Sequence, residues 1–110
     1  MKNNNNSKDR RIFERFKVEL PVRFFDLYHQ QEGEGKTVDV SARGIGLVTE
    51  RPLEPYTPLE LWVEVPQGKS PFYTRAEVVW RKPISEKLIR VGVEFEQANL
   101  LGLSQLLQAR

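Results

Sequence analysis

Residues 89–95 read IRVGVEF, with an apolar side chain at every second position and polar or small residues between them. A period of two residues is typical of a β-strand that buries one face. The same alternation recurs in residues 18–27, 59–65 and 76–80. Together these stretches predict the main strands of a sheet with an apolar interior.

Two shorter strands are predicted at residues 37–40 and 44–49, joined by a tight connection. Residues 30–36 are polar and contain glycines, which favours a turn ahead of them. Six strands without an intervening helix predict an all-β fold, as an antiparallel barrel or a sandwich. Trp80 and Phe95 fall on the apolar side of their alternations, so we expect both in the core.

Proline and leucine patterns define the remaining elements. Pro21 interrupts the first strand, so we expect an edge position or a bulge there. Residues 52–58 carry three prolines and are expected to form a loop. Residues 98–108 change to helical spacing, although Gly102 weakens a helix by roughly 1 kcal/mol relative to alanine. We expect a short C-terminal α-helix, packed on the barrel or closing one end, whose apolar stripe comprises Leu100, Leu103, Leu106 and Leu107.

Length and composition favour one small intracellular domain. A chain of 110 residues has one domain as its default, and the absence of cysteine excludes disulfides and thiolate chemistry. No apolar run approaches the roughly 20 residues that span a bilayer, and the N-terminus lacks the apolar stretch of a secretory signal. We therefore expect a soluble cytoplasmic protein without membrane insertion, its domain covering residues 9–110.

Charge is unevenly distributed along the chain. The first 17 residues hold six Lys or Arg against two acidic residues, a local charge of +4, which leaves −2 for the rest of the +2 chain. Residues 1–8 are polar, of low complexity and without periodicity, so we expect them to be disordered. The pattern predicts a flexible basic N-terminal arm on a slightly acidic body, suited to a phosphate-bearing ligand.

Residues that could perform catalysis are few. His29 is the one histidine of the chain and has no partner for a metal site. Glu32 and Glu34 bracket Gly33 and are interpreted as solvated, and Ser41 has no base to activate it. We predict no catalytic residues, no metal site and no cofactor, and hence no enzyme.

Two motifs could bind a ligand. Arg11 and Arg15 lie four residues apart and Arg10 precedes them; their planar guanidinium groups can grip phosphate oxygens or the edge of a guanine. Further along, residues 39–44 read DVSARG. Asp39 could accept hydrogen bonds from a guanine, but Asp39 and Ser41 could equally cap their own backbone in an ordinary turn. Arg43, Arg81 and Arg90 are interpreted as solvated surface positions.

The two motifs together, in this order, resemble those of the PilZ domain family. The resemblance rests on Arg11 and Arg15, on Asp39-x-Ser41-x-x-Gly44 followed by Gly46-Leu47, and on the strands VVW at 78–80 and RVGVEF at 90–95. It covers nearly all of residues 9–97. Members of this family are bacterial receptors for cyclic di-GMP, built on a six-stranded antiparallel β-barrel with an added helix.

The resemblance implies a ligand and a role for each motif residue. Arg11 and Arg15 would clamp the phosphates and contact the guanines, Asp39 and Ser41 would read a guanine edge, and Gly44 would let the loop close. Arg10 could support a second, intercalated cyclic di-GMP by stacking on a guanine. The arm would become ordered when the ligand binds, and that ordering would be the signal.

We therefore predict a cyclic di-GMP receptor that acts through a separate protein effector. One alternative is a member of the same fold that is a protein–protein adaptor without nucleotide affinity. Another is a small barrel that binds nucleic acid. The slightly acidic body and the lack of an aromatic stacking platform argue against a nucleic acid polymer as partner.

Overall fold

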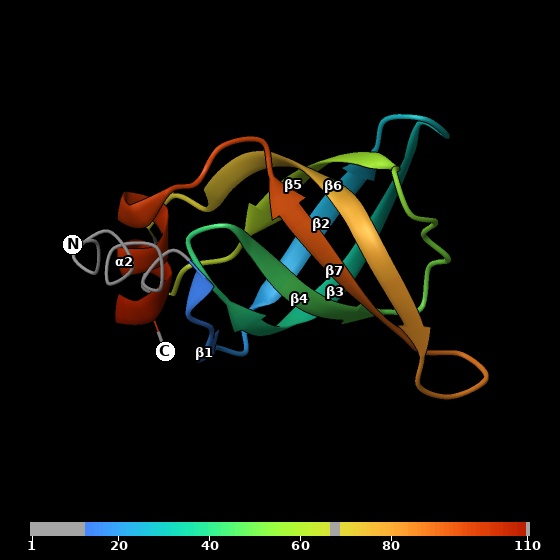
Figure 1. The fold of residues 1–110 in the computed structure, drawn as a ribbon, viewed down its shortest axis with the longest axis horizontal. Helices are drawn as coiled ribbons and strands as arrows, with labels where there is room; N and C mark the ends of the chain where they lie inside the picture. The colour runs from blue at the N-terminus through green and yellow to red at the C-terminus, as the bar shows by residue number, and fades with distance from the viewer. Residues whose placement is uncertain (1–12, 67–68, 110) are drawn as a thin grey trace, which may run out of the picture.

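Six long strands pair into a closed antiparallel barrel in the computed structural model of the chain (Figure 1). The structure describes residues 13–66 and 69–109, so the predicted disorder of residues 1–8 and the placement of Arg10 and Arg11 lie outside the described residues. The elements are β1 (Phe16–Lys17), β2 (Pro21–Asp26), β3 (Gln31–Val40), β4 (Gly44–Thr49), β5 (Pro58–Val63), β6 (Phe72–Pro83), β7 (Ile89–Phe95) and α2 (Leu100–Gln108).

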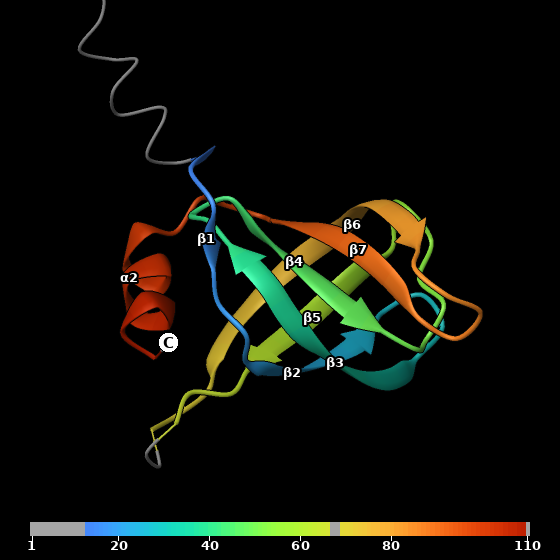
Figure 2. The same ribbon diagram turned by 90° about the horizontal axis from the view of Figure 1, so that it is seen from below.

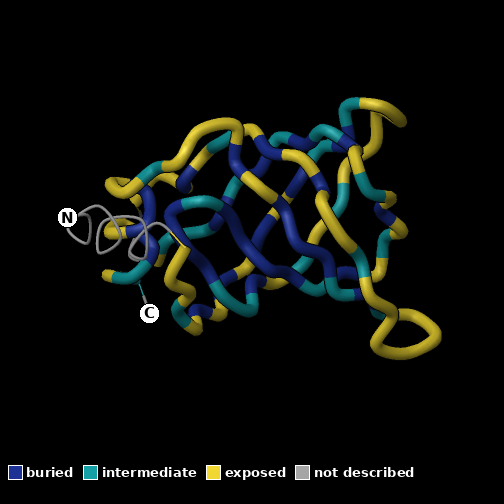
Figure 3. The backbone as a smooth tube through the Cα atoms, viewed as in Figure 1, coloured by how far each residue is buried: buried dark blue, intermediate teal, exposed yellow. Residues whose placement is uncertain are grey.

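Each of the six long strands is hydrogen-bonded on both sides. Around the barrel the order is β2, β3, β4, β7, β6, β5 and back to β2, and the two-residue strand β1 adds to β3. Apolar side chains from these strands form the buried core, and Figure 3 shows buried residues along the barrel strands. The predicted all-β class and the six-stranded antiparallel barrel are confirmed.

The predicted turn at residues 30–36 is wrong, because residues 31–36 form the first part of β3. The turn lies earlier, at residues 27–30. Two inward positions of this part of β3 are glycines, where an apolar side chain would be expected. Neither position has room for a side chain: a Cβ at Gly33 would lie 2.4 Å from Phe24 Cζ, and one at Gly35 would lie 2.3 Å from the Val48 carbonyl oxygen. A strand whose inward positions are glycines shows no apolar alternation.

Pro21 lies neither on an edge strand nor at a bulge. It is the first residue of β2, which pairs with β3 on one side and with β5 on the other. The first position of a strand tolerates proline because the missing N–H falls at the end of the hydrogen-bonded ladder. The alternation that begins at Val18 therefore starts in the connection between β1 and β2, where Val18 and Leu20 are buried.

Trp80 is not a core residue. The register between β6 and β7 shifts between Val78 and Trp80, so that Val79 is an extra residue. Because a bulge moves the following side chain to the other face of the sheet, Val79 and Trp80 are both exposed, by 41% and 43%. Phe95 is buried, as predicted.

Helix α2 lies at one end of the barrel, and the β6–β7 loop projects at the other end (Figures 1 and 2). The Asn99 side chain caps the helix by accepting a hydrogen bond from the Gly102 N–H at 2.7 Å. Leu103 and Leu106 are buried as predicted, whereas Leu100, in the first turn, is 47% exposed. Gly102 allows the helix to approach the barrel, since a Cβ there would lie 2.5 Å from Phe72 Cε1.

A buried carboxylate organises the turn between β2 and β3. Asp26 Oδ1 accepts hydrogen bonds from the backbone N–H groups of Tyr28 and His29, both at 2.9 Å, and Oδ2 lies 2.8 Å from His29 Nδ1. Burial raises the pKa of Asp26, but the hydrogen bonds from His29 and Tyr28 outweigh it and hold the pKa below its usual 3.8. The lone histidine thus has a structural partner.

Replacing Asp26 with alanine should lower the free energy of unfolding by about 1–3 kcal/mol at neutral pH, because two backbone N–H groups of the turn lose their carboxylate acceptor. Since the folded-state pKa is depressed, the stabilisation by Asp26 is complete above its ordinary pKa and is lost as the pH falls through the folded-state value. Urea denaturation of both proteins from pH 7 down to pH 2.5 checks this. The difference between them should shrink at the acid end, and a constant difference would contradict it.

Candidate ligand-binding face

One cross-strand row on the outside of the barrel combines an acid, two glycines and an exposed indole. Asp39 on β3 pairs with Gly46 on β4, Gly46 pairs with Gly92 on β7, and Gly92 pairs with Trp80 on β6. A Cβ at Gly46 would lie 2.7 Å from Asp39 Oδ1, and one at Gly92 would lie 2.3 Å from Trp80 Nε1. The glycines therefore leave a flat floor on which the flanking side chains lie.

Asp39 is held by two arginines from different parts of the chain. Arg15, just before β1, approaches Oδ1 with Nη2 at 2.7 Å and Nε at 3.1 Å. Arg90, on β7, approaches Oδ2 with Nη2 at 3.1 Å. Both carboxylate oxygens thus accept from a guanidinium group, and each interaction fixes the orientation of the Asp39 side chain. Arg90 Nε is buried and has no hydrogen-bond partner among the described residues.

Ser41 shapes the loop between β3 and β4. Its hydroxyl oxygen accepts from the backbone N–H groups of Arg43 and Gly44, both at 3.1 Å, and the Ser41 N–H donates to the Gly44 carbonyl at 2.8 Å. The side chain is completely buried. Of the two possibilities left open by the sequence, Ser41 shows the capping arrangement, whereas the Asp39 carboxylate bonds to arginines.

A shallow hollow of about 130 Å³ lies beside this row. Arg43 forms one wall: its Cζ lies 5.3 Å from the ring centroid of Phe13, and its Nη2 is 2.9 Å from Glu94 Oε2. Small-molecule sites are commonly about 300–1,000 Å³, so a larger ligand would rest over this hollow rather than inside it. Its lining residues are Phe13, Arg15, Ser41, Arg43, Gly44, Val79, Trp80, Gly92, Val93 and Glu94.

Four of the six residues singled out in the sequence are described by the structure, and they lie together on this face: Arg15, Asp39, Ser41 and Gly44. Arg10 and Arg11 lie outside the described residues. Sequence analysis missed Trp80 and Arg90. The signal for Trp80 was the doubled valine before it, which breaks the alternation; for Arg90 no signal in the sequence shows that it contacts Asp39.

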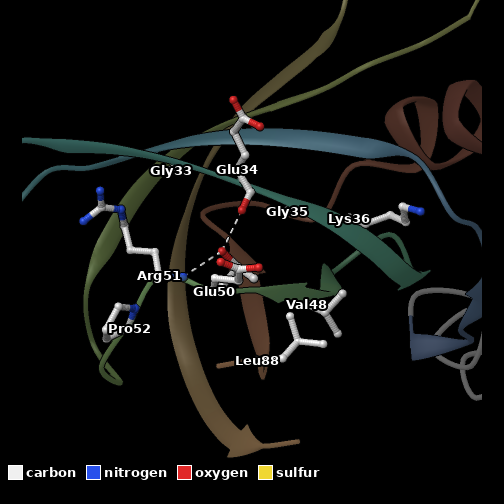
Figure 4. Close-up of a pocket in the computed structure, with 10 residues that line it drawn as sticks. Gly33, Glu34, Gly35, Lys36, Val48, Glu50, Arg51, Pro52 and Leu88 are labelled. Atoms are coloured by element: carbon white, nitrogen blue, oxygen red, sulfur yellow. Dashed lines mark hydrogen bonds between the residues drawn. The ribbon is translucent and has the colours of Figure 1, made fainter. Parts of the chain in front are cut away.

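A second hollow, of about 790 Å³, opens beside the first part of β3 and the end of β4, and none of the motif residues lines it (Figure 4). Its floor is held by Thr49, whose hydroxyl donates to the Glu34 carbonyl at 2.6 Å and accepts from the Arg51 N–H at 3.2 Å. Acidic and basic side chains alternate around it without an aromatic surface. Charges of both signs give it little preference for an anion.

Within residues 13–66 and 69–109, no group of three or more metal-ligating side chains is placed to hold a metal ion. In the same part of the chain, no helix combines the length and the apolar character needed to cross a membrane.

Comparison with known families identifies the PilZ domain, whose model matches residues 9–109. A comparison with curated proteins finds no significant match.

Several solved structures share the fold. The Bacillus subtilis inhibitor of motility MotI (DgrA) superposes with a TM-score of 0.65 at 17% identity, over 86% of this chain and 47% of that one. The PilZ domain of YcgR from Escherichia coli, solved with c-di-GMP, has a TM-score of 0.63 at 16% identity, over 86% of both chains. The PilZ domain of CeSA from a cellulose-synthesising bacterium has a TM-score of 0.59 at 16% identity, over 86% and 92%. The chain thus spans about half of MotI.

Replacing Gly92 with alanine should displace the Trp80 indole, because the added Cβ would overlap Nε1. The chain has two tryptophans, so a ¹H–¹⁵N NMR spectrum contains two indole N–H signals. We expect the Trp80 signal to shift and the Trp62 signal to stay in place as the internal control. An unchanged Trp80 signal would contradict the contact.

Proposed function

The chain belongs to the PilZ domain family, and we propose that it is a receptor for cyclic di-GMP that binds the dinucleotide on the face formed by Arg15, Asp39 and Trp80. PilZ domains are binding and adaptor modules. We further infer that this chain has no catalytic activity of its own and that it acts in the cytoplasm through a protein effector. The PilZ domain of YcgR was solved with this ligand and has the same fold.

One observation supports the proposal: the Arg15 guanidinium, the Asp39 carboxylate and the exposed Trp80 indole lie on one face of the barrel, with two glycines between Asp39 and Trp80. Cyclic di-GMP presents two phosphates and two guanines. The phosphates require guanidinium groups, and the guanines require a carboxylate acceptor and a flat surface on which to stack. Arg15 supplies a guanidinium group, Asp39 can accept from a guanine, and the Trp80 ring offers a flat apolar surface. Gly46 and Gly92 let a planar base approach the sheet closely.

The contacts around Asp39 suggest how the ligand enters. Arg15 bonds to Asp39 in the structure, so a phosphate that binds Arg15 competes with that carboxylate. Arg90 remains on the other oxygen and would keep Asp39 oriented toward the guanine. We assign Ser41 and Gly44 to holding the loop at its tight turn, and Arg10 and Arg11 to completing the phosphate contacts. A second bound molecule would stack against Arg10.

Isothermal titration calorimetry with cyclic di-GMP, with GTP as control, tests the proposal. We expect binding near micromolar, about −8 kcal/mol, and no heat with GTP. Replacing Arg11 or Arg15 with alanine should weaken binding by about 2–5 kcal/mol because a phosphate loses its charged partner. Lys8→Ala is the matched control and should bind nearly as well as the parent.

The stoichiometry of the same titration tests the role of Arg10. Two ligands per chain that fall to one in Arg10→Ala would support the stacked second molecule, and one ligand per parent chain would remove it. Absence of heat together with absence of a thermal shift would instead favour the adaptor that has no nucleotide affinity.

Replacing Arg90 with alanine should also weaken binding, by about 1.5–3 kcal/mol, because Asp39 loses the charged hydrogen bond that orients it. Arg81→Ala is the matched control, since Arg81 pairs with Glu54 at 2.6 Å, and neither residue lines the hollow beside Trp80. Titration of both variants in a Trp62→Phe background, followed by the fluorescence of Trp80, measures the effect. Equal affinity in the two variants would remove Arg90 from the site.

A further inference from the structure

The side of the barrel opposite the ligand-binding face carries exposed aromatic side chains. In the strand order, β2 and β5 lie across the barrel from β7 and β4, and Figure 1 shows β4 and β7 in front of β2. One cross-strand row on this side comprises Arg23 on β2, Trp62 on β5 and Tyr73 on β6. Arg23 Cζ lies 5.4 Å from the centroid of the Trp62 ring, and the Trp62 and Tyr73 centroids are 5.4 Å apart.

Four glutamates surround these rings. Glu60 accepts a hydrogen bond from the Tyr73 hydroxyl at 2.7 Å, which raises the pKa of Tyr73, and Glu64 Oε2 lies 3.2 Å from Arg23 Nε. The other two carboxylates, those of Glu32 and Glu34, have no partner among the described residues. With Arg23, this set carries a charge of −3, and Arg75, which pairs with Glu60 across β5 and β6, brings the local charge to −2. We call Arg23, Phe25, Glu32, Glu34, Glu60, Trp62, Glu64 and Tyr73 the acidic aromatic face.

The two unpaired carboxylates lie at a hollow in this face. The hollow measures about 520 Å³ and is lined by Arg23, Phe24, Phe25, Glu32, Gly33, Glu34, Glu60 and Trp62. Figure 4 shows the Glu34 side chain pointing away from Val48 and Leu88, the aliphatic residues of the neighbouring hollow. The row through Glu34 continues to Arg23 and Trp62, and the next row joins Glu32 to Phe25 and Glu60.

Packing of the barrel core does not explain why these aromatic and acidic side chains lie together on the outer surface. The core is filled by the inward-facing side chains of the same strands, whereas Tyr73 is 46% exposed and the Trp62 and Phe25 side chains are half-buried. Trp, Tyr, Phe and Arg are the residue types enriched in protein interfaces. Strands β2 and β5, at the centre of this face, are paired on both sides along nearly their whole length, so a partner there engages side chains.

We propose that the acidic aromatic face docks a partner protein through a basic segment of that partner. Lys or Arg side chains would pair with Glu32 and Glu34, and their aliphatic stems would cover Phe25 and Trp62. Charge complementarity selects this occupant: the face carries a net negative charge, and its two free carboxylates adjoin apolar surface. The site is separate from the nucleotide face and rests on the proposed function only in that the partner would be the effector.

The two tryptophans make the test specific, since one lies on each face. The probe is a ten-residue peptide of alternating Arg and Ala, and the control peptide has Glu in place of Arg. Indole N–H signals are assigned with Trp62→Phe and Trp80→Phe and followed by ¹H–¹⁵N NMR. We expect the basic peptide to move the Trp62 signal, the acidic peptide to move neither signal, and cyclic di-GMP to move the Trp80 signal. The nucleotide result and the peptide result are therefore independent.

The double variant Glu32→Gln/Glu34→Gln should bind the basic peptide roughly 2- to 30-fold more weakly, because two exposed ion pairs are lost. Glu14→Gln/Glu86→Gln is the matched control, with the same change in net charge at two exposed positions that form no ion pair in the described chain. It should bind as the parent does. Added salt should weaken binding to the parent more than binding to the Glu32/Glu34 variant.

Three results would overturn the proposal. The Trp62 signal could stay unmoved at millimolar basic peptide, or the two double variants could lose affinity equally, which would show attraction to net charge alone. Light scattering could also reveal a dimer of this chain that Glu32→Gln/Glu34→Gln abolishes, in which case the occupant is a second copy.

Discussion

The pairing of β3 with β4 closes the barrel, and both surfaces of interest depend on it. Its register shifts between Thr37 and Asp39, after which Asp39 faces outward opposite Gly46. Only in that register does the carboxylate lie over a glycine, within reach of Arg15 from before β1 and of Arg90 from β7. The same closure gives every long strand a paired neighbour on each side, so recognition on the outside of the barrel falls mainly to side chains.

Strand β6 contributes one aromatic side chain to each of the two faces, and the faces differ in charge. Its early part places Tyr73 on the acidic aromatic face, and its later part places Trp80 on the ligand-binding face. The bulge at Val79 turns Trp80 outward over Gly92, where an unbulged strand would have buried it. Acids on the ligand-binding face are neutralised by arginines, as Asp39 and Glu94 show, whereas Glu32 and Glu34 across the barrel are not. The charge difference separates the side that we propose binds an anion from the side that we propose binds a basic segment.

Periodicity was sufficient to predict the strands whose inward positions are apolar and the helix that carries buried leucines. It failed at β3, where Gly33 and Gly35 replace the apolar side chains, and at Trp80, where one extra residue reverses the phase. Of the site, the motifs pointed to Arg15, Asp39, Ser41 and Gly44. The contact of Arg90 with Asp39 joins residues 51 positions apart, and no local pattern encodes a contact that depends on barrel closure.

The Arg15–Asp39 contact leaves Arg15 available to a ligand. The Arg15 side chain is 44% exposed, and an ion pair of this exposure contributes about 0–1 kcal/mol. A phosphate that brings further charged contacts can therefore displace Asp39 from Arg15 at little cost, while Arg90 still neutralises the carboxylate. A deeply buried pair would resist this exchange, because separating its charges costs about 3–5 kcal/mol. Partial exposure would thus let the same contact hold Arg15 near the proposed site and release it to a bound phosphate.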